Sequence, residues 1–199
     1  MADPDDRTLA AFVFKNRGLL LALPAAALAI GGRPTALSIA AGLPLAIAGE
    51  LLRCWAVGYS GTTTRNGVVT APKLASGGPY AYVRNPLYIG NFVTAAGFAV
   101  AFTGGNSQLA RGALVAGSLA SMAAVYAAIV PHEEAFLHAR FGEVFERYCE
   151  RVPRILPRLR PSDGGDGEWD AQVLVEAESN TIALFGAMFA VLVIKALRG

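Results

Sequence analysis

Two polar stretches of this 199-residue sequence carry the residue types that could do chemistry. The first, GGPYAYVRNPLYIGN at residues 77–91, runs without a break into an apolar segment. Its Gly-Gly-Pro start predicts a turn, Pro86 suits the first turn of a helix, and Asn85 can cap that helix. The free N–H groups of a helix N-terminus beside Arg84 attract anions. This stretch therefore predicts a site for a carboxylate or a phosphate.

The tyrosines of the same stretch admit two interpretations. Tyr80, Tyr82 and Tyr88 can form aromatic walls around a bound anion. They can equally form an aromatic belt at a membrane interface, with a snorkelling arginine beside it. The residues by themselves leave both interpretations open.

The second stretch, VPHEEAFLHARFGEVFERYCERVPRILP at residues 130–157, follows another apolar segment. The predicted helix runs past Pro131 into Glu133 and Glu134, and carboxylates at the end of an apolar helix are costly to bury unless they are paired or used. One of them is expected to face the first stretch. Farther along, aromatic and leucine side chains alternate with charges and predict an amphipathic helix lying on the membrane surface: Phe136, Leu137, Phe141, Phe145 and Tyr148.

The composition places these stretches in a membrane protein. The chain is 54% hydrophobic and 16% charged, with a mean hydropathy of +0.43, which is too apolar for an ordinary soluble domain. We expect no nucleic-acid partner. Cys54 and Cys149 are too few for a disulfide framework, and His132 and His138 lack companions, so we expect no metal site. The acidic start MADPDDRTLA does not resemble a cleaved signal peptide.

Five segments are candidates to span the membrane, because a spanning helix needs about 20 mostly apolar residues. They are residues 18–30, 36–59, 86–104, 112–130 and 181–197. The first becomes long enough only by tilting or by including residues 9–14, and it is otherwise an interfacial helix. The second carries Glu50 and Arg53, which can pair or reach the interface. The sequence thus predicts an all-α integral membrane protein with four to five transmembrane helices.

Positive charge predicts the orientation. Four of the 17 basic residues fall on one side of the predicted helices, namely Arg33, Arg111, Lys195 and Arg198, and the rest fall on the other. Because basic residues are enriched on the inner side of membranes, we expect the N-terminus and both long polar segments to be cytoplasmic. We interpret residues 1–199 as a single domain, with residues 158–180 forming a flexible linker that contains SDGGDG. The role of the helix over 181–197 and the oligomeric state stay open.

Together the two stretches, with RCWAVGYSGTTTR before them, resemble the membrane methyltransferases typified by isoprenylcysteine carboxyl methyltransferase and the phospholipid methyltransferases. The resemblance covers about residues 49–157. It implies that the cytoplasmic loop, the amphipathic helix and the spanning helices form a pocket for S-adenosylmethionine (SAM). By resemblance the cofactor-binding residues are Leu74, Ala75, Tyr80, Arg84, Asn85, Pro86, Leu87, Tyr88 and Glu133. The candidates for catalysis are Glu133, Glu134 and Arg84, with Arg84 as the anion clamp.

Two departures from the family pattern matter. Asn85 stands where histidine is commoner, and an asparagine cannot gain a proton, which argues against an acid or base at that position. Ile129 stands four residues before Glu133, where the prenylcysteine enzymes carry a substrate-binding arginine. We therefore expect a lipid with another nucleophile, such as an amine, at least as much as a prenylcysteine carboxylate.

The resulting hypothesis is SAM-dependent methyl transfer to a lipophilic acceptor that enters between helices from the membrane. Two alternatives remain. One is a membrane lipid or sterol reductase that uses NADPH, since such enzymes share a related Arg-His-Pro-x-Tyr-x-Gly segment, but Gly90 is followed here by Asn91 and not by glutamate. The other is a membrane module without catalytic activity.

Overall fold

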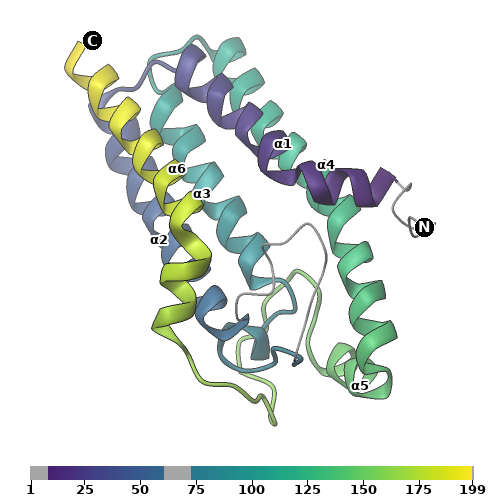
Figure 1. Cartoon of the computed structure of the whole chain (residues 1–199). Helices are drawn as coiled ribbons and strands as arrows, with labels where there is room; N and C mark the ends of the chain where they lie inside the picture. Colours follow the sequence, from purple (N-terminus) through teal and green to yellow (C-terminus); the bar gives the residue numbers. More distant parts are fainter. Residues whose placement is uncertain (1–8, 61–72, 199) are drawn as a thin grey trace.

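The fold is an elongated bundle of helices, seen in a computed structural model that describes residues 9–60 and 73–198. All regular structure in those residues is helical, as the sequence predicts (Figure 1). The elements are α1 (Leu9–Gly31), α2 (Ala36–Ser60), the 3-10 helix η3 (Gly78–Ala81), α3 (Pro86–Thr103), α4 (Gln108–Phe141), α5 (Glu143–Arg151) and α6 (Ala171–Arg198). The first eight residues of the N-terminus, predicted to be cytoplasmic, and the last residues of the RCWAVGYSGTTTR stretch lie outside the described residues.

Five of these helices are long and apolar enough to cross a membrane, which confirms the upper count from the sequence. Their spanning parts are Phe12–Gly31, Ala36–Ser60, Pro86–Thr103, Gln108–Phe141 and Thr181–Arg198. The first predicted segment, residues 18–30, is long enough to span because α1 also includes the residues from Leu9 to Arg17. Arg17 remains compatible with this helix because its guanidinium lies 4.0 Å from the centroid of the Phe14 ring and donates to the Phe14 carbonyl. The protein is an integral membrane protein.

One end of the bundle, here called the turn end, carries the two short connections and the C-terminus of α6. Asn106 joins the connections by accepting from the Arg33 amide at 2.8 Å and donating to the Gly31 carbonyl at 2.9 Å. Lys195 of α6 donates to the carbonyls of Ile30 and Gly32. The four basic residues that were expected on one side of the membrane therefore lie at this end: Arg33, Arg111, Lys195 and Arg198.

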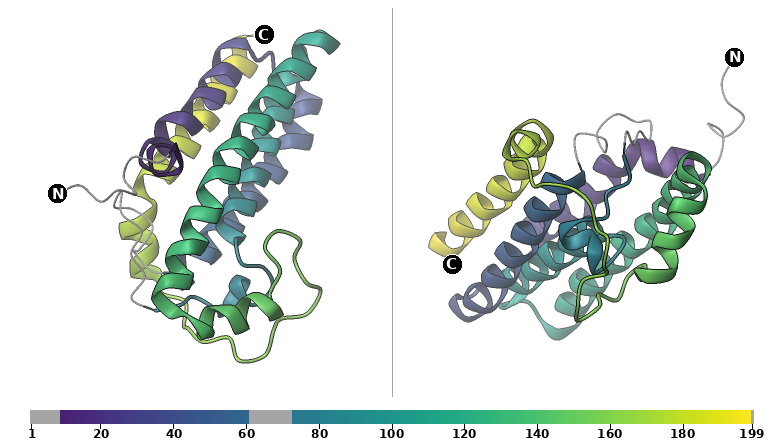
Figure 2. Two further views of the ribbon diagram at one scale, coloured as in Figure 1. Left: turned by 90° about the vertical axis from the view of Figure 1, so that its right-hand side faces the viewer. Right: turned by 90° about the horizontal axis from the view of Figure 1, so that it is seen from below.

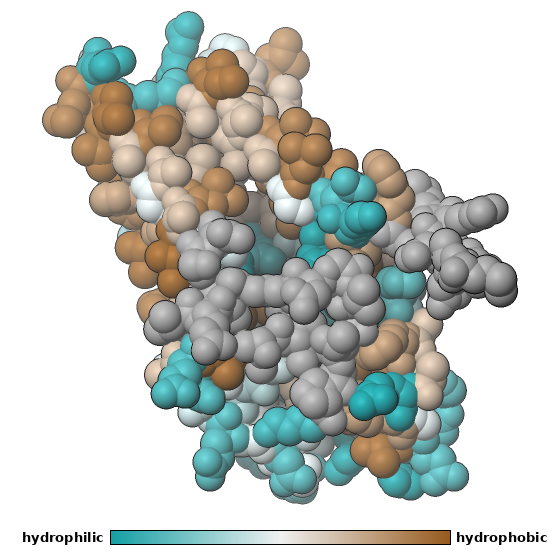
Figure 3. All heavy atoms as spheres, in the orientation of Figure 1, coloured by the Kyte–Doolittle hydropathy of each residue, from teal (hydrophilic) through white to brown (hydrophobic). Residues whose placement is uncertain are grey.

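The opposite end, here called the loop end, carries η3, α5, the start of α3 and the end of α4. Hydrophilic side chains gather over it, while apolar side chains cover the helices above it (Figure 3). The segment 152–170 crosses η3 and is held there by backbone bonds, since the Arg158 amide donates to the Tyr82 carbonyl and the Ser162 amide to the Ala81 carbonyl. This segment, here called the strap, is therefore held against η3 by backbone hydrogen bonds, while most of its side chains are exposed.

The remainder of the predicted linker is helical. The helix α6 begins at Ala171, before its apolar span, which starts at Thr181 as expected. Asp170 explains the early start because its carboxylate accepts from the Gln172 amide at 2.8 Å, as the residue before a helix commonly does.

The predicted surface helix is also different from expectation. Its sequence is divided between the end of α4 and the separate helix α5, which turns away beneath the bundle (Figure 2). The break lies at Gly142, whose φ of 51° is readily adopted only by glycine. Phe145 and Tyr148 of α5 are buried against Leu74 and Phe141, so the apolar face of α5 packs inside the protein.

Close packing of α2 on α3 holds the bundle together. A Cβ atom at Gly97 would overlap the backbone of Ala46, and one at Gly49 would overlap the backbone of Thr94. Small residues let membrane helices approach in this way, which increases dispersion contacts along their length. The sequence showed such residues but not which of them lie at the contact.

We expect Gly97→Leu to separate α2 from α3 and to lower the free energy of unfolding by about 2 kcal/mol, the usual cost of overpacking. The measurement is reversible unfolding of the purified protein in mixed detergent micelles. Gly117→Leu is the control, since a Cβ at Gly117 meets no atom within 4 Å. Equal stability of the two variants would contradict this account of the contact.

Candidate functional site

The candidate site lies at the loop end, where α3 begins. Pro86 occupies the first turn of α3, as predicted, but the Asn85 side chain does not cap the helix. Its Nδ2 instead donates to the Arg154 carbonyl at 3.1 Å, and the Arg84 amide donates to the Pro153 carbonyl at 2.9 Å. The capping prediction was therefore wrong, because the strap after α5 offers an acceptor for the Asn85 amide. Asn85 joins the start of α3 to that strap.

Glu133 faces α3. Its Oε1 accepts a hydrogen bond of 2.6 Å from the hydroxyl of Tyr88, which lies in the first turn of α3. The Tyr88 ring packs on the ring of Tyr126, with 4.5 Å between the centroids. Glu133 lies about 38 Å along α4 from Gln108, at 1.5 Å per residue, beyond the roughly 30 Å of a hydrocarbon core. A carboxylate can therefore sit at the polar boundary while α4 still spans.

Glu134 points elsewhere, because consecutive helical residues are about 100° apart. It pairs with Arg84 at 3.2 Å and also with Arg154, whose Nε and Nη2 both donate to the carboxylate. The side chains of Glu134 and Arg84 are 12% and 15% exposed, while that of Arg154 is 49% exposed. Donation of these hydrogen bonds to the Glu134 carboxylate raises the pKa of Arg154. Glu134 thus ties α4 to Arg84 just before α3 and to Arg154 just after α5.

Arg84 also contacts α5. Its Nη1 donates to the Cys149 sulfur at 2.8 Å, whereas its buried Nε has no hydrogen-bond partner among the described residues. Next to Cys149, the Tyr148 hydroxyl donates to the Tyr80 carbonyl at 2.9 Å. Burial raises the pKa of both tyrosine hydroxyls, and a hydrogen bond between Tyr80 and Ser60 opposes that rise for Tyr80. These tyrosines are neutral at physiological pH.

The structure brings some of the predicted site residues together and leaves others at the margin. Arg84 with Glu134 and Tyr88 with Glu133 form two pairs, which start from adjacent positions on α4. Leu74 packs on the buried cluster of α5. Tyr82 faces α2, with 6.4 Å between its ring centroid and that of Trp55. Ala75 and Leu87 are partly buried.

Sequence reasoning missed Cys149 and Arg154. Both lie inside the quoted stretch 130–157, but no pattern within it shows that Arg84 would reach them across the fold. Among the described residues, no group of three or more His, Cys, Asp or Glu side chains is placed to hold a metal ion.

Alkylation of Cys149 is expected to keep increasing above pH 9. Burial raises the pKa of its thiol, and the neighbouring Arg84 guanidinium opposes the rise. Since the thiolate is the reactive form and an ordinary thiol has a pKa of about 8.5, a raised pKa moves the reaction to higher pH. The measurement is the rate of iodoacetamide labelling of a Cys54→Ser variant between pH 7 and 10. A labelling rate that reaches a plateau near pH 8.5 would contradict a raised pKa of the Cys149 thiol.

Comparison with known proteins places this chain in a family. The chain matches the phospholipid methyltransferase family over residues 37–144, more than half of its length. It belongs to that family. The matched part runs from α2 to the start of α5 and contains Arg84, Tyr88, Glu133 and Glu134. Arg154, α1 and α6 lie outside it.

Two curated proteins are similar to this member of the phospholipid methyltransferase family. The cobalt-zinc-cadmium resistance protein CzcN of Cupriavidus metallidurans is 32% identical over 132 residues, which are 66% of this chain and 53% of the relative. The protein-S-isoprenylcysteine O-methyltransferase of Schizosaccharomyces pombe is 33% identical over 88 residues, which are 43% of this chain and 34% of the relative. The alignments thus span about half and a third of these relatives. No solved structure matches.

Proposed function

We propose that this protein is a SAM-dependent methyltransferase that methylates a lipid or another lipophilic acceptor at the membrane interface. The observation that carries the proposal is the meeting of two pairs at the loop end, Arg84 with Glu134 and Tyr88 with Glu133. All four residues lie in the family-matched segment. The isoprenylcysteine methyltransferase among the similar proteins supports the same class of reaction.

The residues at this end fit the polar groups of SAM. The buried Arg84 Nε is a donor with no hydrogen-bond partner among the described residues, and it suits the carboxylate of the amino-acid tail. Glu133 offers a carboxylate for the ammonium group or the ribose hydroxyls. Buried donors seldom go without an acceptor, so an incoming carboxylate would satisfy Arg84. Tyr80, Asn85 and Leu74 border the same region and complete the proposed cofactor-binding set with Ala75, Pro86 and Leu87.

When bound, SAM supplies a methyl group on a positively charged sulfur, and the acceptor's lone pair bonds to that carbon while the carbon–sulfur electrons stay on sulfur. The protein has mainly to align the acceptor and exclude water. Glu133, held by Tyr88, is the candidate group for anchoring and for taking a proton from an acceptor amine. Glu134, engaged by two arginines, fits the positioning of Arg84 better than proton transfer.

We further propose that the loop end faces the cytoplasm. Four basic residues belong to the turn end, and the excess of lysine and arginine at the loop end favours the inner side of the membrane. SAM is made in the cytoplasm, so this orientation would give it direct access. Labelling of Cys149 by a membrane-impermeant maleimide in inverted vesicles but not in intact cells would support the orientation, and the reverse pattern would refute it.

Ligand titration separates the proposed function from its alternatives. The purified protein in detergent is titrated with SAM and, separately, with NADPH by calorimetry, and methyl transfer from tritiated SAM to a lipid extract of the host cells is then measured. We expect binding of SAM and label in the lipid fraction. Binding of NADPH alone would favour a membrane reductase, and binding of neither would favour a non-catalytic module.

A further inference from the structure

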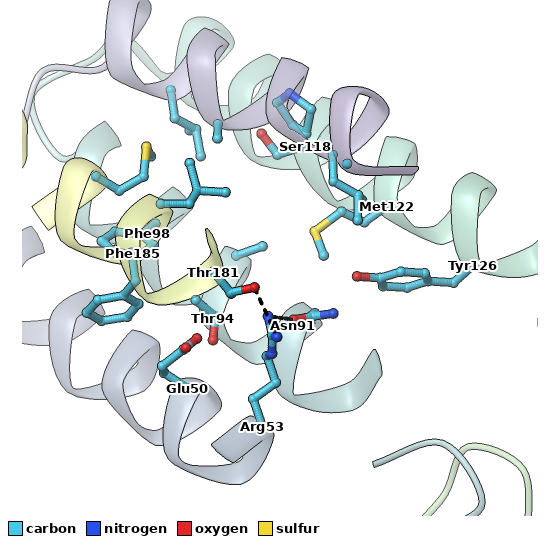
Figure 4. Close-up of a pocket in the computed structure, with 18 residues that line it drawn as sticks. Glu50, Arg53, Asn91, Thr94, Phe98, Ser118, Met122, Tyr126, Thr181 and Phe185 are labelled. Atoms are coloured by element: carbon cyan, nitrogen blue, oxygen red, sulfur yellow. Dashed lines mark hydrogen bonds between the residues drawn. The ribbon is translucent and has the colours of Figure 1, made fainter. Parts of the chain in front are cut away.

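A cavity of about 210 Å³ lies within the bundle, between α1, α2, α3, α4 and α6 (Figure 4). Most of its wall is apolar and comes from residues such as Leu21, Met122 and Phe185. Two of the five helices, α1 and α6, lie outside the family-matched residues. The cavity is therefore partly a property of this chain and not of the matched segment alone.

Polar side chains gather on one wall of this cavity. Arg53 is only 8% exposed and donates from Nη1 to Asn91 at 2.9 Å and from Nη2 to Thr181 at 3.1 Å. The sequence predicted that Arg53 can pair with Glu50 or reach the interface, and these two bonds hold its guanidinium inside the bundle. Glu50 lines the same wall, so the cavity wall holds one acidic and one basic side chain. Polar groups at this depth are costly and usually mark a binding site.

The cavity opens sideways, between α1 and α6. The two helices touch near the turn end, where Leu28 packs with Met188 and Leu192. Toward the loop end they diverge, and the surface between them is hollowed (Figures 1 and 3). Gly18 on α1 and Leu184 on α6 line the cavity and are exposed at its two edges. A molecule in the membrane can enter through this opening.

The inner wall of the cavity is shared with the candidate active site. Tyr126 lines the cavity, and its ring packs on Tyr88, which donates to Glu133. Asn91 is one turn of α3 beyond Tyr88. The polar wall is thus next to the residues proposed to bind SAM, as a methyl acceptor requires.

Resting on the proposed function, we propose that this cavity binds the methyl acceptor and that the acceptor is a single-chain amphiphile whose small headgroup has no net charge. Pockets for drug-sized ligands are usually about 300–1,000 Å³, so this one holds a headgroup and the first carbons, with the rest of one chain passing between α1 and α6. One basic and one acidic side chain, Arg53 and Glu50, match a headgroup with both acceptors and donors. A headgroup with two negative charges would leave charge uncompensated in a low dielectric.

The test is native mass spectrometry of the purified protein after incubation with an equimolar mixture of three oleoyl lipids. They are monoolein, which is neutral, lysophosphatidylethanolamine, which is zwitterionic, and lysophosphatidate, which is anionic. We expect retention of the first two to exceed that of lysophosphatidate by about tenfold. Greater retention of lysophosphatidate, or equal retention of all three, would overturn the proposal.

Two variants locate the binding. Gly18→Phe is expected to lower retention of monoolein by at least about tenfold, because a Cβ at Gly18 meets no atom within 4 Å and a phenyl ring can fill the opening without moving the helices. Gly117→Phe, also with open space at its Cβ, is the matched control on the outside of α4. Thr181→Val removes one hydroxyl from the polar wall and is expected to lower retention about fivefold.

SAM titration of the same samples separates the two proposals. Unchanged retention in Gly18→Phe and Thr181→Val, with normal SAM binding, would overturn the acceptor site and leave the methyltransferase proposal standing. Failure of the wild-type protein to bind SAM, with retention as expected, would remove the methyltransferase role. The cavity would then be an amphiphile site without a methyl donor.

Discussion

Replacing Glu133 by glutamine is expected to lower SAM affinity by about ten- to a hundredfold and to abolish most methyl transfer. Glutamine has nearly the same volume and can still accept from Tyr88 through its carbonyl oxygen. What it loses is the charge that would hold the ammonium group or the ribose of SAM. Hydrogen bonds to charged groups contribute about 1.5–3 kcal/mol, which corresponds to that range of affinity.

Calorimetric titration of SAM into the detergent-purified variant measures the effect. Glu143→Gln is the matched control, because Glu143 lies at the same end of the bundle but is exposed on α5. Tyr88→Phe tests orientation: it keeps the Glu133 charge and removes the hydroxyl that holds it, so an intermediate loss is expected. If Glu133→Gln binds SAM as tightly as the wild type while folding normally, Glu133 has no role in cofactor binding.

The spanning helices were the most predictable part of the fold. Long apolar segments must form helices in a membrane, since every backbone N–H and C=O needs a partner there. The segments 36–59 and 86–104 therefore match α2 and α3 closely. The boundaries outside the membrane were less predictable. The Asp170 side chain caps the start of α6, and the positive φ of Gly142 ends α4. Neither boundary coincides with a change in the hydrophobic pattern of the sequence.

The candidate site was predictable as a set of residues but not as a set of contacts. Residue type placed Arg84, Glu133 and Glu134 at one end of two helices. It could not say that Glu134 would take Arg84 while Glu133 took Tyr88, because that choice depends on the rotation of α4 about its axis. The intramembrane cavity could not be predicted from the sequence. Arg53 meets Thr181 across 128 positions of sequence, and no local pattern encodes that distance.

The second large effect is expected for Glu134→Gln, which should lower the free energy of unfolding by about 2–4 kcal/mol. Breaking a buried ion pair by removing one partner leaves the other charge uncompensated, which usually costs about 3–5 kcal/mol. The small exposure of Arg84 and Glu134 places this pair just below that range. Arg154→Gln is expected to cost less than about 1 kcal/mol, since Arg154 is half exposed and solvent screens its charge.

A double-mutant cycle isolates the Arg84–Glu134 interaction. Removing both charges, as Arg84→Gln with Glu134→Gln, leaves only the half-exposed Arg154 without its carboxylate partner, so the double variant is expected to lose less stability than the sum of the single variants. Unfolding in mixed micelles gives the stabilities, and SAM affinity gives a second measurement that packing alone would not change. Because Glu134 positions Arg84, the Glu134→Gln variant is expected to bind SAM more weakly even where it remains folded. Strict additivity of the two changes would show that the pair does not couple α4 to the start of α3.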